Sequence, residues 1–176
     1  MKLWLERALF VIAPQDSGKS SQLRDMFLDR KLGANGVIPE SRNIPDTYYI
    51  TNERRLYVRL TSPHEYDESP AEFINKAREK MGSGRWCFAG ALQPGAFKKM
   101  PNAVESIRLF IAEFKPERVR AVFLSPNRHG KLFSEFSDDR DLLRDLLDIP
   151  SVEVACIDAR RRRSNGLLLA DFFDFS

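Results

Sequence analysis

The residues best suited to chemistry in this chain are Gly18, Lys19 and Ser20, which end a polar loop that follows an apolar run. Residues 9–12 are typical of a buried strand, and residues 20–28 are typical of a helix. Such a loop leads into a helix N-terminus, where backbone N–H donors lack partners within the helix and favour a bound anion. A lysine ammonium and a serine hydroxyl at this point would suit a phosphate and its metal ion.

The spacing from Ala13 to Ser20 follows the pattern G-x-x-x-x-G-K-[ST], except that Ala13 stands where the first glycine is usual. It resembles the P-loop, or Walker A motif, of the P-loop NTPase superfamily. The resemblance implies that ATP or GTP binds together with Mg²⁺. Lys19 would contact the β- and γ-phosphates, and the Ser20 hydroxyl would bind the metal. The implied nucleotide-binding residues are Gln15, Asp16, Ser17, Gly18, Lys19, Ser20 and Ser21.

Two residues depart from what this loop usually contains. Ala13 ends the strand, and Pro14 then fixes its own φ at about −65°, so the missing glycine is a small loss. Asp16 brings a carboxylate close to the expected phosphates, although Asp tolerates left-handed backbone and its side chain can turn to solvent or to a bound cation. The alternative interpretation is a plain turn between a strand and a helix.

Length and composition predict a single P-loop NTPase-like domain over residues 1–176, of the soluble globular class. A net charge of +3 gives no indication of nucleic-acid binding. Cys87 and Cys156 each lie in an apolar run, which predicts core thiols, no metal site and a reducing cytoplasm. No stretch approaches the ~20 apolar residues that a membrane span needs, so we expect no membrane association.

Strands and helices alternate along the chain. The pattern predicts a helix over residues 18–31, a hairpin of strands 47–51 and 55–61, and then helices 70–81, 103–114, 138–147 and 167–175 alternating with strands 85–92, 119–124 and 152–158. This order predicts a three-layer α/β/α fold with a mostly parallel sheet and one antiparallel hairpin strand. It resembles the connectivity of small GTPases. Their guanine-reading Asn-Lys-x-Asp is absent, because the corresponding loop reads Ser125-Pro126-Asn127-Arg128.

The resemblance also requires an acid that coordinates Mg²⁺ through water. Glu65 and Asp67 follow the second hairpin strand and are the best placed candidates, and we predict Glu65 and Lys19 as the catalytic residues. His64 beside them either orients a water or is an exposed loop histidine. Asp46 lies ahead of the hairpin, where a switch-like segment would approach the metal, and Asp158 ends a strand expected at the far side of the sheet.

Three hypotheses follow. The first is a slow Mg²⁺-dependent NTPase whose nucleotide state controls a partner protein, with the loops flanking the hairpin responding to the γ-phosphate. The second is a small-molecule or nucleotide kinase, because Arg160 to Arg163 resemble the arginine lid of small P-loop kinases. The third is a degenerate P-loop fold that serves as a non-catalytic interaction module. In that case Phe172, Phe173 and Phe175 would form a partner or homodimer surface, unless they pack in the core.

Overall fold

A six-stranded sheet forms the centre of the molecule, and its strands lie in the order β2-β3-β4-β1-β5-β6. The computed structural model describes residues 2–32, 36–39, 47–135 and 141–173. Among the described strands only β2 runs antiparallel, against β3, and the others are mutually parallel, which confirms the mostly parallel sheet. The strands are β1 (Leu3–Ile12), β2 (Tyr48–Tyr49), β3 (Arg54–Arg59), β4 (Gly84–Leu92), β5 (Arg118–Leu124) and β6 (Val152–Ile157).

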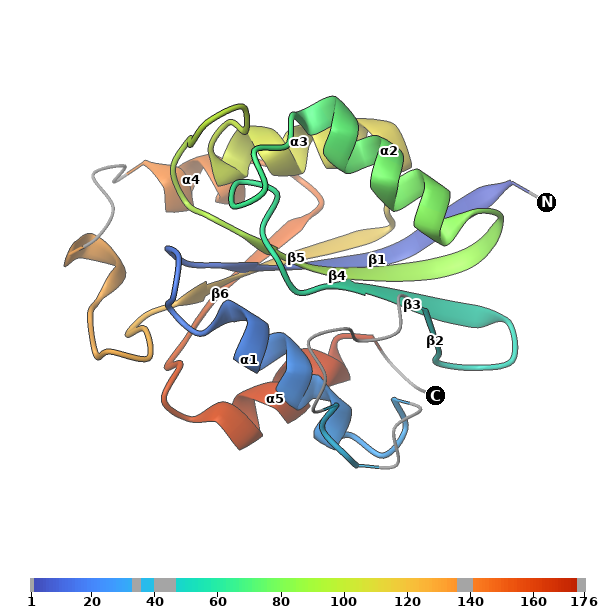
Figure 1. The fold of residues 1–176 in the computed structure, drawn as a ribbon, viewed down its shortest axis with the longest axis horizontal. Coiled ribbons are helices and arrows are strands. Elements are labelled where there is room, and N and C mark those ends of the chain that lie inside the picture. The colour runs from blue at the N-terminus through green and yellow to red at the C-terminus, as the bar shows by residue number, and fades with distance from the viewer. Residues whose placement is uncertain (1, 33–35, 40–46, 136–140, 174–176) are drawn as a thin grey trace.

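Helices cover both faces of this sheet, as Figure 1 shows, in agreement with the predicted α/β class with three layers. On one face lie α1 (Lys19–Asp25) and α5 (Arg162–Asp171), and on the other lie α2 (Pro70–Met81), α3 (Ala103–Phe114) and α4 (Leu142–Leu147). In the part of the chain that the structure describes, no helix has the length and apolarity to cross a bilayer.

Alternation along β1 divides the core into two halves. Phe10 and Ile12 pack into the cluster under α2 and α3, whereas Leu9 and Val11 pack into the cluster under α1 and α5. All four side chains are fully buried. Because β1 is held from both faces and paired with a strand on each side, the loop that follows it starts from a rigid point.

Several helix boundaries differ from the sequence prediction. The helix predicted over residues 18–31 is wrong in length, because α1 ends at Asp25 and a 3₁₀ turn (Met26–Leu28) follows. The described part of α4 begins at Leu142, and residues 138–140 of its predicted span lie outside the described residues. The last helix begins at Arg162, five residues before its predicted start at Leu167, so half of the arginine run is helical.

The carboxyl ends of the parallel strands meet at one edge of the sheet, which is where ligands bind in open α/β sheets. At this edge β4 lies between β1 and β3, so the hairpin is not beside the strand of the Gly-Lys-Ser loop. The loop after β3 therefore has to pass the end of β4 to reach the loop after β1. The strand β6 lies at the far edge of the sheet, as predicted for the strand that Asp158 follows.

Candidate functional site

The loop after β1 is bent by two residues with left-handed backbone. The N–H of Ala13 donates to the carbonyl of Leu92 at 3.2 Å, which keeps the chain paired with β4 just past the strand. Asp16 then has a φ of 59° and Gly18 a φ of 98°. Aspartate tolerates this conformation better than most residues and glycine adopts it without steric cost. The chain is thereby turned back, and α1 begins at Lys19.

A small polar pocket of about 110 Å³ lies over this loop. Its size suits phosphate groups and is well below the roughly 300 Å³ at which sites for whole drug-sized ligands begin. Gln15 is exposed and lies outside the lining, in contrast to the other residues predicted for the nucleotide. The lining residues are Asp16, Ser17, Gly18, Lys19, Ser20, Ser21, Glu65 and Arg128.

Lys19 is the buried cation of the pocket. Its Nζ donates to the carbonyl of Pro14 at 2.6 Å and lies 3.7 Å from Oε1 of Glu65. Burial lowers the pKa of Lys19 from 10.5 to about 8, although the carboxylate of Glu65 acts in the opposite direction. The ammonium is therefore poorly compensated by its present neighbours, which is a state that an incoming anion would relieve.

Glu65 reaches the pocket from the loop after β3. That loop is joined to α1, because the Ser20 hydroxyl donates to the carbonyl of Leu60 at 3.0 Å. The structure thus brings together the predicted pair Lys19 and Glu65, although their strands are not neighbours in the sheet.

The acidic and hydroxyl side chains of the pocket lining are too few to hold a metal ion by themselves, but they could hold one together with a bound phosphate. No group of three or more His, Cys, Asp or Glu side chains among the described residues could hold a metal ion. Mg²⁺ keeps several waters and is usually bound by one or two carboxylates together with substrate phosphates. The Ser20 hydroxyl with the carboxylates of Glu65 and Asp16, all in the lining, fits Mg²⁺ that arrives with a phosphate chain.

His64 does not face solvent, so its interpretation as an exposed loop histidine is wrong. Its residue is fully buried, Nδ1 lies 3.0 Å from the Ser62 hydroxyl, and Nε2 lies 2.8 Å from the carbonyl of Pro101. Burial, with a smaller contribution from Lys19, lowers the pKa of this imidazole. The side chain joins the loop after β3 to the loop after β4 and thereby supports Glu65.

Two of the other acids considered as Mg²⁺ ligands, Asp67 and Asp158, lie outside the pocket lining. Asp67 forms an ion pair with Lys99 at 3.6 Å, and Asp46 lies outside the described residues. Asp158 forms an ion pair with Arg160 at 2.8 Å, and that arginine lowers the pKa of the carboxyl to about 2.

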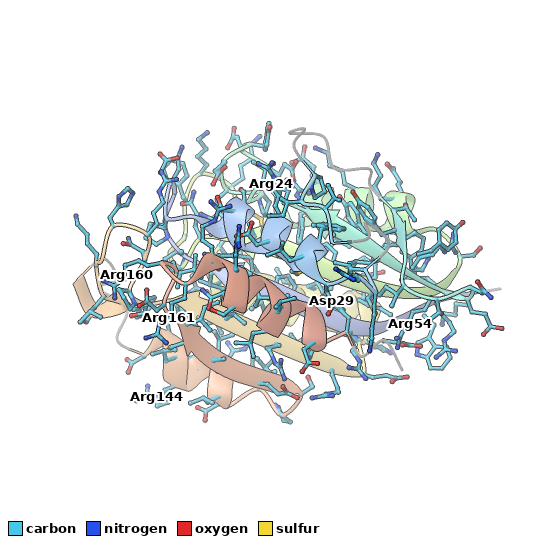
Figure 2. The ribbon with its side chains drawn as sticks, turned by 90° about the horizontal axis from the view of Figure 1, so that it is seen from below. Arg24, Asp29, Arg54, Arg144, Arg160 and Arg161 are labelled. Carbon is cyan, nitrogen blue, oxygen red and sulfur yellow. The ribbon has the colours of Figure 1, made fainter. Side chains whose placement is uncertain are left out.

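The arginine run does not contribute to the pocket lining. Figure 2 shows Arg160 and Arg161 at the end of the molecule opposite Arg54, the end at which the parallel strands finish, but neither residue belongs to the pocket lining. Arg162, inside α5, makes two hydrogen bonds of 2.9 and 3.0 Å to the carboxylate of Asp25 on α1. These hydrogen bonds hold the start of α5 against α1, so Arg162 is engaged away from the pocket.

Arg128 was missed by reasoning from the sequence, and it lies in the loop after β5. Three contacts join this loop to the loop after β1. The Arg128 N–H lies 3.4 Å from the Ser17 carbonyl, Asn127 Nδ2 lies 3.5 Å from the Ser17 hydroxyl, and His129 Nε2 lies 3.2 Å from the Asp16 carbonyl. The available signal was its position in the loop that follows a buried strand parallel to β1.

The two free cysteines differ in burial. Cys87 is buried in β4, and burial raises the pKa of its thiol to about 12. Cys156 is exposed on the edge strand β6, so its prediction as a core thiol is wrong. Phe172 and Phe173 are buried, so they form no partner surface, and Phe175 lies outside the described residues.

Comparisons with known proteins give no indication of function, so the inference of function rests on the pocket. No protein-family model matches the chain, and neither the curated proteins nor the solved structures contain a match.

Proposed function

We propose that this protein is a P-loop NTPase that binds ATP or GTP with Mg²⁺ in the pocket over Asp16–Ser21 and hydrolyses it slowly. The observation that supports this proposal most is the state of Lys19. Its ammonium is buried, its pKa is lowered to about 8, and it lines a pocket of the size of phosphate groups. Binding of the phosphate chain supplies the negative charge that this cation lacks.

The roles of the side chains follow from their present contacts. With the nucleotide bound, Lys19 would contact phosphate oxygens in place of the carboxylate of Glu65, and the Ser20 hydroxyl would hold Mg²⁺ in place of its hydrogen bond to the Leu60 carbonyl. The released carboxylate of Glu65 is then free to orient a water or to hold the metal through one. Among the described residues, the pocket lining offers two carboxylates, Asp16 and Glu65, as general bases, and neither is paired with a histidine, so we expect a low rate of hydrolysis.

The same change of contacts would let the bound nucleotide alter the surface that a partner meets. Glu65 and the carbonyl of Leu60 both belong to the loop after β3, so loss of their contacts with α1 would detach this loop from α1 in the nucleotide-bound state, while His64 still holds it to the loop after β4. A partner protein or a second copy of the chain that contacts this loop would sense the nucleotide. Free cysteines are in keeping with a reducing cytoplasm as the compartment.

A thermal melt with and without Mg²⁺ tests the proposal. At a hundredfold excess over Kd, a nucleotide adds about 2.7 kcal/mol of stability, which is a rise in Tm of about 5–10 °C for a chain of this length. ATP and GTP should act alike, because the pocket is too small to enclose a base. Lys19→Ala should abolish the rise, and Lys2→Ala, an exposed lysine at the other end of β1, should keep it.

Two results would contradict the proposal. A response of Lys19→Ala equal to that of the wild type would place the nucleotide elsewhere. Absence of any response in the wild type would favour the hypothesis of a non-catalytic interaction module.

We do not propose the kinase, because Arg160 and Arg162 are already paired with carboxylates outside the pocket.

A further inference from the structure

A second cation lines the same pocket from the side of β5. Arg128 is exposed, and its aliphatic side chain packs over Gly18, where an added Cβ would lie 3.5 Å from Arg128 Cβ and 3.6 Å from Arg128 Cδ. Its backbone N–H lies 3.4 Å from the carbonyl of Ser17. The guanidinium is therefore carried by a backbone that is fixed relative to the loop after β1.

The backbone of this loop is itself held by one buried side chain. Oδ1 of Asn127 accepts hydrogen bonds from the N–H of His129 at 2.9 Å and from the N–H of Lys131 at 3.1 Å. Asn127 is 4 % exposed, and its Nδ2 lies 3.5 Å from the Ser17 hydroxyl. A loop organised in this way presents Arg128 in a defined position and not as a random surface charge.

Arg128 differs from Lys19 in having no acidic partner among the residues that the structure describes. Within the described ranges no carboxylate forms an ion pair with its guanidinium, whose Nε instead donates to Nε2 of His129 at 3.1 Å. Arginine stays charged at every physiological pH, and its planar fork of donors matches the oxygens of a phosphate. An anion that enters the pocket can meet this cation without first breaking a salt bridge.

We propose that Arg128 is a phosphate-binding residue, and that it clamps the phosphate chain from the side opposite Glu65. The proposal deepens the function proposed above and rests on it. It also specifies the ligand class, because a site that holds phosphates between Lys19 and Arg128 recognises a polyphosphate chain whatever base is attached to it.

His129 is placed to hold Arg128 ready for this role. Its Nε2 lies 3.1 Å from Arg128 Nε and 3.2 Å from the carbonyl of Asp16. One ring nitrogen either accepts or donates a hydrogen bond, so the two contacts exclude each other. When Arg128 turns to a phosphate, the Nε2–H tautomer donates to Asp16, and the loop remains attached to the loop after β1.

The test measures the affinity of wild type, Arg128→Gln and Arg128→Lys for Mg-ATP and for inorganic tripolyphosphate by calorimetry. Loss of a charge-assisted pair of hydrogen bonds should weaken both ligands about tenfold or more in Arg128→Gln, and by the same factor for each. Arg128→Lys keeps the positive charge but loses the planar fork of donors, so its loss of affinity should be smaller than that of Arg128→Gln. Arg144→Gln is the matched control, an exposed arginine on α4 that should bind both ligands like the wild type.

The possible results separate the two proposals. If the wild type binds both ligands and Arg128→Gln binds them equally well, the role of Arg128 is refuted and the NTPase proposal stands. If Arg128→Gln loses affinity for ATP alone, the residue contacts base or ribose and the polyphosphate assignment is wrong. If the wild type binds neither ligand, both proposals fail. Unchanged ligand-free melting of Arg128→Gln shows that the variant is folded.

Discussion

Replacing Lys19 by methionine should make the ligand-free protein more stable at neutral pH. The lowering of the Lys19 pKa from 10.5 to about 8 measures how much the fold disfavours the ammonium. At about 1.4 kcal/mol per pKa unit, the cost of keeping it charged is about 3 kcal/mol. Methionine avoids that cost and loses the hydrogen bond to the Pro14 carbonyl, worth about 1 kcal/mol. The expected net gain at pH 7 is about 2 kcal/mol, or about 4–8 °C in Tm.

The gain should depend on pH in a definite direction. Because the folded pKa of Lys19 lies below the unfolded value, the folded protein binds fewer protons between pH 8 and 10.5. The stability of the wild type relative to the variant therefore rises with pH across this window. Below pH 8 the cost of the charged lysine is fully present, and above pH 10.5 it is gone. There the variant should be less stable than the wild type by about 1 kcal/mol, the lost hydrogen bond.

Urea denaturation of both proteins at pH 7, 9 and 10.5 tests this reasoning, with the difference in unfolding free energy as the readout. Other groups that titrate in the window are common to both proteins and cancel in the difference. About a quarter of the Glu65 side chain is exposed, so its carboxylate stays solvated when Lys19 is replaced. A methionine variant that is less stable at pH 7, or whose difference does not change with pH, would refute the view of Lys19 as a strained binding residue.

Three further substitutions have expected outcomes. Glu65→Gln should still bind Mg-ATP in calorimetry and lose phosphate release in a steady-state assay, whereas equal turnover would exclude Glu65 as the base. Gly18→Ala places a side chain at a φ of +98° and should destabilise the protein by about 1–2 kcal/mol in urea, which an unchanged midpoint would contradict. Arg162→Gln leaves the buried Asp25 carboxylate without its partner and should cost about 3 kcal/mol, while Arg163→Gln, next to it and exposed, should cost little.

Much of the fold could be predicted from local sequence, because its strands are short apolar runs with clear turns between them. Ser69 and Glu72 form the capping box that sets the start of α2, and Asn102 caps α3. The boundaries of α1 and α5 could not be read in the same way. The bidentate pair of Arg162 with Asp25 joins residues 137 positions apart, and such a contact has no signal in local periodicity.

The residues that the loop after β1 contributes to the candidate site could be predicted from the sequence. The residues that the neighbouring loops contribute could not. Gly18, Lys19 and Ser20 follow one another in the sequence, so their spacing carries the signal. Arg128 comes from a loop that lies beside this one only because β5 pairs with β1. The sequence around His64 is typical of a polar loop, and its burial depends on a hydrogen bond with the carbonyl of Pro101, which follows β4. Strand order decides these contacts, and the sequence alone does not specify it.

A structural salt bridge elsewhere in the molecule offers a comparison that supports the proposal of Lys19 and Glu65 as a binding pair. Glu6 is buried at the other end of the sheet, where it pairs with Arg54 at 3.1 Å and also accepts a hydrogen bond from Arg85 at 2.6 Å. There a carboxylate meets two side chains that never lose their charge. Lys19 meets one carboxylate at 3.7 Å, and burial lowers its pKa despite that carboxylate. Because the ligand-free fold does not balance this charge, retaining lysine at the position is costly unless an anion binds there.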